Sequence, residues 1–124
     1  MLIRANSLGT IEDQVGGFVI RVLASELETA SPGNLVLFEP VDENGTRVTT
    51  YLIEGTVDLH PSDISYRWRG TGPSSVRITC TEPIVVRLET GAVSPTAVTS
   101  LTFQELLFEG CGIAIEAECN GGAS

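Results

Sequence analysis

The segment "DLHPSD", residues 58–63, carries the side chains best suited to acid–base chemistry. If this segment is extended, Asp58 and His60 face the same side, where a carboxylate can orient an imidazole for general-base catalysis. His60 is the only histidine in the chain, which excludes metal centres built on two histidines. The proline after His60 holds it extended, and no motif supplies the other members of a catalytic triad. The segment therefore favours a strand end followed by a turn over a catalytic centre.

Three cysteines, Cys80, Cys111 and Cys119, offer a second kind of chemistry. A straight strand at ~3.3 Å per residue would hold Cys111 and Cys119 about 26 Å apart, too far for a disulfide. Their spacing is also not that of a zinc ribbon. We expect reduced, buried thiols that pack as small apolar groups, while the sequence leaves the pairing and redox state of the three open.

Two turn-like segments resemble fragments of ligand sites. Asp42-x-Asn44-Gly45 begins like a calcium loop, but the later ligands and the closing glutamate are missing, so a hairpin turn is favoured. The run "RGTGPSS" at 69–75 has the small residues of an anion-binding nest without the lysine or helix of a phosphate loop. We therefore expect neither a metal nor a cofactor.

Residues 64–69, "ISYRWR", combine the only tryptophan of the chain with two arginines. The composition and the flanking proline and glycine predict a strand. With a side-chain period of two, Tyr66 and Trp68 point to one face, and Arg67 and Arg69 to the other. The aromatic face predicts burial in the core, which leaves the arginines for solvent or a partner.

The next run, "SVRITC", extends the pattern and suggests a row of arginines. If a hairpin joins the two strands, Arg67 lies opposite Arg77, and Arg87 continues the row if the corner before it preserves phase. Like charges opposite each other destabilise a sheet, so acidic groups must cover the row. Glu82 and Glu89 within the same subunit are one possible source of these groups. The other is a protein partner, whose interface we expect at Arg67, Arg69, Arg77 and Arg87.

The charge inventory narrows the choice of partners. The 124 residues include sixteen acidic residues, seven arginines and no lysine, for a net charge of −9. This balance disfavours nucleic acid and anionic membranes. The absence of lysine excludes Schiff-base enzymes and the usual phosphate-loop lysine. Arginine is concentrated in residues 64–90, so a positive ribbon on an acidic body would be self-complementary.

The distribution of β-branched, aromatic and turn residues predicts an all-β fold. We expect a single β-sandwich or jelly-roll-like domain of about eight or nine short strands over residues 1–119, with a mobile tail at 120–124. At most one or two short helical turns are expected, one of them at the Ser25-x-x-Glu28 capping box. Residues 102–109 fit helix or strand, and no internal repeat is found. The expected strands lie near 2–5, 17–24, 34–39, 46–59, 64–69, 75–80, 84–89, 97–103 and 111–118.

In size, class and composition over its whole length, the chain resembles the compact β-rich proteins of tailed-phage particles, such as capsid cement or decoration proteins and tail-assembly components. No diagnostic motif accompanies this resemblance, so it transfers no functional residue. It implies stabilisation of a particle without catalysis, and a major capsid or tail protein as partner. It also implies a virion location after assembly in the host cytoplasm. In agreement with this location, the sequence shows no signal peptide and no apolar run of the ~18–20 residues that cross a membrane.

The expected function is therefore that of a non-enzymatic structural protein that self-associates or binds a larger assembly. Two alternatives remain open. One is a ligand-binding β-sandwich, for example a carbohydrate-binding module that stacks sugars on exposed Tyr66 and Trp68. The other is a hydrolase or isomerase that uses His60 with a neighbouring aspartate.

Overall fold

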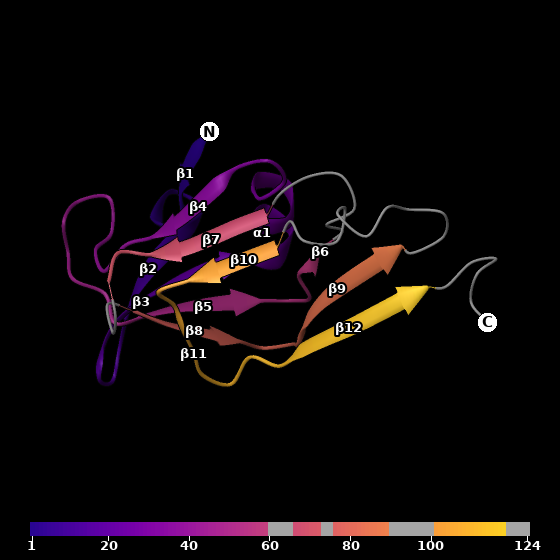
Figure 1. Ribbon diagram of the computed structural model, residues 1–124. Coiled ribbons are helices and arrows are strands. Elements are labelled where there is room, and N and C mark those ends of the chain that lie inside the picture. Colours follow the sequence, from indigo (N-terminus) through magenta and orange to yellow (C-terminus); the bar gives the residue numbers. More distant parts are fainter. Residues whose placement is uncertain (60–65, 73–75, 90–100, 119–124) are drawn as a thin grey trace.

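The computed structural model describes residues 1–59, 66–72, 76–89 and 101–118. These residues form three β-sheets (Figure 1). One α-helix, α1 (Ala24–Ala30), and one short 3-10 helix, η1 (Ala5–Ser7), complete the described elements. The expected tail at 120–124 lies outside the described residues.

The first sheet, called here the β7 sheet, is parallel throughout. In spatial order it consists of β1 (Leu2–Arg4), β4 (Leu35–Phe38), β7 (Tyr66–Gly70) and β10 (Leu101–Gln104).

The second sheet, the β5 sheet, is parallel except for its last pair, a β2–β3 hairpin. Its order is β11 (Leu107–Phe108), β8 (Arg77–Cys80), β5 (Thr50–Glu54), β3 (Gly17–Leu23) and β2 (Gly9–Gln14). The third sheet, the β9 sheet, is parallel in the order β12 (Ile113–Glu118), β9 (Ile84–Glu89) and β6 (Asp58–Leu59).

The chain visits these three sheets in turn, so its path forms successive coils of a parallel β-helix. β5, β6 and β7 make one coil, β8, β9 and β10 make the next, and β11 and β12 begin a third. Thr50, Arg77 and Leu107 lie side by side although roughly 30 residues separate each from the next, a repeat length typical of solenoids. In Figure 1, strands of successive coils accordingly run side by side and point the same way, as β9 and β12 do.

The predicted β-sandwich or jelly-roll-like fold is wrong. The described part of the chain has twelve strands in three mostly parallel sheets, together with one α-helix. Most predicted strands exist, but apart from the β2–β3 hairpin they pair with the strand one coil away and not with their neighbours in sequence. The expectation failed because a period of two identifies the inward face of a strand without identifying its partner. The coil repeat was also missed, since the equivalent residues Thr50, Arg77 and Leu107 share no chemical type.

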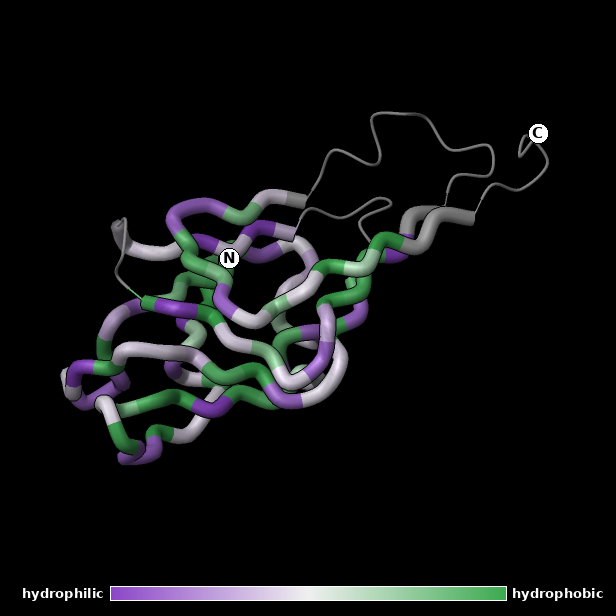
Figure 2. The backbone as a smooth tube through the Cα atoms, turned by 90° about the horizontal axis from the view of Figure 1, so that it is seen from below, coloured by the Kyte–Doolittle hydropathy of each residue, from purple (hydrophilic) through white to green (hydrophobic). Residues whose placement is uncertain are grey.

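The core consists of inward-facing side chains stacked in rows along the solenoid. Val36, Trp68 and Phe103 are in register in the β7 sheet. Tyr51 and Ile78 are in register in the β5 sheet and fully buried. Figure 2 shows the matching alternation of hydrophobic and hydrophilic residues along the chain. Burying each large apolar side chain stabilises the fold by about 1.5–3 kcal/mol, so these rows are the main source of stability.

The predicted capping box at Ser25-x-x-Glu28 does not form. α1 begins at Ala24 without a side-chain cap, and Glu28 instead accepts a hydrogen bond from the backbone N–H of Asp58 at 2.7 Å. The helix is seven residues long, more than the single turn expected, and connects β3 to β4 in the first coil. Residues 102–109 are strand and corner, since β10 ends at Gln104, Glu105 has a positive φ of 54°, and β11 follows.

The predicted turn at Asp42-x-Asn44-Gly45 is confirmed. Asp42 Oδ1 accepts hydrogen bonds from the backbone N–H groups of Asn44 and Thr46, at 3.0 and 2.7 Å. Gly45 has a φ of 85°, which glycine adopts without strain. An antiparallel bridge between Val41 and Arg47 closes the turn. The Asp42 carboxylate therefore stabilises the backbone of this turn.

Candidate interaction surfaces

The predicted row of arginines does not form, because β7, β8 and β9 belong to three different sheets. Arg77 on β8 forms an ion pair with Glu109 at 3.3 Å, and Arg87 on β9 forms one with Asp58 at 2.8 Å. Both pairs join neighbouring coils at the surface, where such contacts contribute roughly 0–1 kcal/mol. Of the four predicted interface residues, the structure therefore brings only Arg67 and Arg69 together.

Arg67 and Arg69 lie on the outer face of the β7 sheet. The alternation predicted for this strand is confirmed, with Tyr66 and Trp68 buried and the two arginines exposed. Neither arginine forms an ion pair with a carboxylate of the described residues. Both are therefore available for a partner.

The neighbours of these arginines make the outer face partly apolar. Leu35 on β4 is in register with Arg67, and Leu37 is in register with Arg69. Both leucines are half-buried, and β10 contributes two polar residues in the same rows, Thr102 and Gln104. We call this outer face of β4, β7 and β10 the arginine–leucine face. Arginine is enriched at protein interfaces, and the two leucines add apolar surface beside it.

Burial removes the basis for sugar stacking on the "ISYRWR" segment. Trp68 is 0% exposed, and its indole N–H donates a hydrogen bond to Ser31 Oγ at 3.0 Å. Tyr66 is 5% exposed. Neither ring offers a surface on which a sugar could stack.

Only the first two residues of the acid–base segment 58–63 lie among the described residues. Asp58 lies on β6, and its carboxylate accepts hydrogen bonds from Nε of Arg87 at 2.8 and 3.1 Å. His60 lies outside the described residues, as do Pro61, Ser62 and Asp63. Asp58 thus has a structural role, since it ties β6 to β9 beside the backbone ladder.

A cleft of about 780 Å³ opens at the start of β5 and β8. Arg47, Arg77 and Thr49 are among its described lining residues, which include no carboxylate, thiol or imidazole. These groups can attract an anion but supply no acid–base pair. Sequence reasoning missed this cleft because it joins residues from separate coils.

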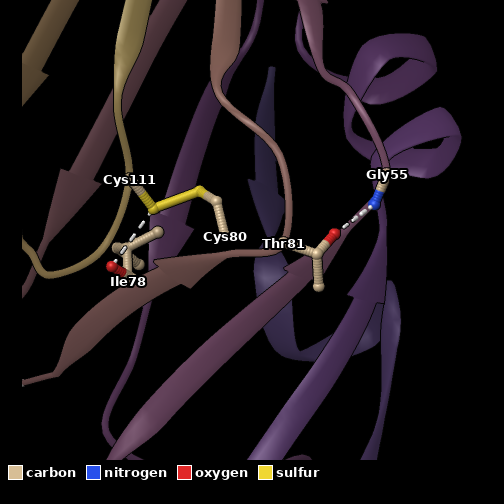
Figure 3. The surroundings of a disulfide bond; sticks show 5 residues. All are labelled: Gly55, Ile78, Cys80, Thr81 and Cys111. Carbon is tan, nitrogen blue, oxygen red and sulfur yellow. Dashed lines mark hydrogen bonds between the residues drawn. A yellow bond between two sulfur atoms is a disulfide. The ribbon is translucent and has the colours of Figure 1, made fainter.

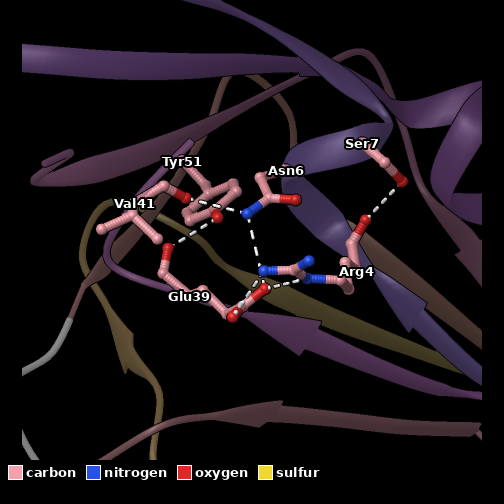
Figure 4. A network of polar contacts seen from close by, with 6 residues as sticks. All are labelled: Arg4, Asn6, Ser7, Glu39, Val41 and Tyr51. Atoms are coloured by element: carbon pink, nitrogen blue, oxygen red, sulfur yellow. Dashed lines mark hydrogen bonds and ion pairs between the residues drawn. The ribbon is translucent and has the colours of Figure 1, made fainter. Parts of the chain in front are cut away.

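A network of polar contacts joins the first strand to the turn after β4 (Figure 4). Arg4 donates hydrogen bonds to the Glu39 carboxylate, and buried Asn6 donates one to the carbonyl oxygen of Val41 at 2.9 Å. The Tyr51 hydroxyl donates one to the carbonyl oxygen of Glu39 at 2.7 Å. Together these contacts attach the N-terminal segment to the coils.

Tyr51 makes stability sensitive to alkaline pH. Burial raises the pKa of Tyr51 above the ordinary tyrosine value of about 10. A group whose pKa is raised on folding contributes stability that is complete below its unfolded pKa and is lost as pH rises toward its folded pKa. The melting temperature should therefore fall as pH rises above about 10, and Tyr51→Phe should weaken this fall. Thermal melts of both proteins between neutral and alkaline pH test this, and identical pH profiles would contradict it.

The structure pairs Cys80 with Cys111 in a disulfide, with a Cα–Cα distance of 4.9 Å (Figure 3). The prediction of reduced thiols is therefore wrong for these two residues. The bond joins the end of β8 to the chain after β11, one coil further on. The 31-residue separation, which matches the coil length, was the available signal. Without a recognised repeat, this separation did not predict the disulfide. The third cysteine, Cys119, lies outside the described residues.

Comparison of the chain with protein-family models, curated proteins and solved structures finds no match. No group of three or more metal-binding side chains occurs among the residues that the structure describes. Within the same residues, no helix is long and apolar enough to cross a membrane.

Proposed function

We propose that this chain is a non-enzymatic structural protein that joins a larger assembly through protein–protein contacts at the arginine–leucine face. The observation that carries the proposal is the pair of exposed arginines on β7, which have no ion-pair partner among the described residues. A forked guanidinium binds carboxylates well, so the surface that fits this face is acidic.

A second copy of the chain is the partner this charge distribution favours. The chain has a net charge of −9, so a positive face on one copy finds acidic surface on another. Such a contact joins two different surfaces and is therefore heterologous, which suits a component of a ring or an extended particle.

The finer proposal is a component of a phage particle, either a capsid cement or decoration protein or a tail protein. Support comes from the size, composition and strand-rich architecture of the chain. The Cys80–Cys111 disulfide fits a finished particle, since virion surfaces are among the settings in which disulfides persist.

Charge reversal on the arginine–leucine face tests the proposal. Arg67→Glu/Arg69→Glu should abolish self-association in sedimentation velocity, because it replaces both carboxylate-binding groups with carboxylates. Arg47→Glu/Arg77→Glu is the matched control, since it changes the net charge equally and leaves β7 intact. Equal loss of self-association in both variants would show that net charge, and not this face, governs assembly.

A further inference from the structure

The last described coil exposes two apolar side chains of β12 that continue rows of the core. Ile113 is in register with Ile84, and Ile115 with Val86. In the preceding coil these positions are 0% and 3% exposed, whereas Ile113 is 47% and Ile115 66% exposed. Two isoleucines that continue core rows are therefore exposed.

The backbone edge of β12 is also unpaired within the described part of the chain, where β12 pairs only with β9. Ile84 N–H donates a hydrogen bond to the carbonyl oxygen of Gly112 at 2.9 Å. Because backbone groups alternate sides along a parallel ladder, those of Ala114 also point to β9. Those of Ile113, Ile115 and Ala117 point away from it. Figure 1 shows β12 beside β9. An exposed edge beside exposed apolar side chains is a template for adding a strand.

The charge of this end indicates what kind of strand fits it. Residues 101–118 include Glu105, Glu109, Glu116 and Glu118 but no basic residue, and one of these glutamates, Glu109, forms an ion pair with Arg77 of the preceding coil. Two copies meeting at these ends would bring two acidic segments together, which like-charge repulsion opposes.

The N-terminal end of a second copy is also a poor match for the β12 edge. Residues 1–30 carry Arg4 and Arg21 against a larger number of acidic residues, and β2 pairs antiparallel over the edge of the β5 sheet. The arginine–leucine face of another copy supplies positive charge, but its backbone groups are already used within its own sheet. A separate basic strand satisfies the edge, the apolar surface and the charge together.

We infer that the β12 edge is a docking site for an extended, basic segment of a different protein, which adds to the β9 sheet as a further strand. Its apolar side chains cover Ile113 and Ile115, and its positive charge complements the acidic sequence of the last coil. This site extends the proposed assembly role to a second surface, on a different sheet from the arginine–leucine face.

A short peptide of alternating valine and arginine is the probe, labelled for fluorescence anisotropy, with a valine–glutamate peptide of equal length as its control. The whole chain should bind the first peptide, more weakly at high salt, and should not bind the second. Ile115→Pro should weaken binding roughly tenfold or more, because it removes an outward N–H without breaking the β9 ladder. Ile115→Val, which keeps that N–H, should bind as the unmodified chain does.

Ile115→Lys gives a second test that keeps the backbone edge intact, and its positive charge should weaken binding of the arginine peptide. Arg67→Glu/Arg69→Glu should bind the peptide normally, so a failed assembly proposal and a failed edge proposal are distinguishable. Equal binding of both peptides, or unchanged binding by both the Ile115→Pro and Ile115→Lys variants, would overturn the inference. Absence of binding to the arginine peptide would overturn it as well.

Discussion

Replacing Trp68 with alanine should lower the free energy of unfolding by about 3–5 kcal/mol, as for other large buried aromatic residues. The side chain is 0% exposed, and its ring centroid lies 5.6 Å from that of Phe38 and 5.0 Å from that of Phe103. These rings belong to three neighbouring strands of the β7 sheet, so truncation leaves a cavity shared by successive coils. The change also leaves the buried Ser31 hydroxyl without the indole donor.

Urea denaturation followed by circular dichroism measures this loss. The matched control is Arg67→Ala on the same strand, whose outward side chain should change stability by no more than about 0.5 kcal/mol. Similar losses from the two substitutions would contradict the assignment of inner and outer faces on β7.

Removing the disulfide should have the second large effect. A Cys80→Ala/Cys111→Ala variant should lose about 3–4 kcal/mol, the chain-entropy value for a loop of roughly this length. The bond closes a 31-residue separation and holds the last coil against β8. Without it, β11 and β12 are held mainly by their ladders to β8 and β9. We therefore expect faster amide exchange in these two strands before the other coils are affected.

Hydrogen exchange and urea denaturation of the double variant test this, with Cys119→Ala as the control that leaves the bond intact. Adding a reductant to the unmodified chain should reproduce the effect of the double variant. Unchanged stability in both experiments would show that the bond does not constrain the folded chain.

Local features of the fold were predictable from the sequence, because they depend on neighbouring residues. Alternation along "ISYRWR" correctly placed Trp68 inside and Arg67 outside. The pairing of strands was not predictable in this way. Turn residues between β7 and β8 suggest a hairpin, yet these two strands belong to different sheets. A short connection between two strands fits both a hairpin and a passage to another sheet, and only contacts between residues distant in sequence distinguish the two.

The candidate surfaces show the same division. Exposure of Arg67 and Arg69 followed from periodicity. Arg77, which was predicted to lie opposite Arg67, instead lies on another sheet and forms an ion pair with Glu109. The open edge at β12 was not predictable, because Ile113 and Ile115 have the pattern of an ordinary core strand. Only the absence of a further described strand beside them makes them exposed.

Light scattering of the unmodified chain at two salt concentrations tests the assembly role most directly. At ~0.15 M salt, screening over about 8 Å weakens repulsion between the acidic bodies but spares contacts between arginine and carboxylate. The proposed role predicts an oligomer under this condition that dissociates at ~1 M salt, where exposed charge pairs are screened. A monomer at both concentrations would contradict it.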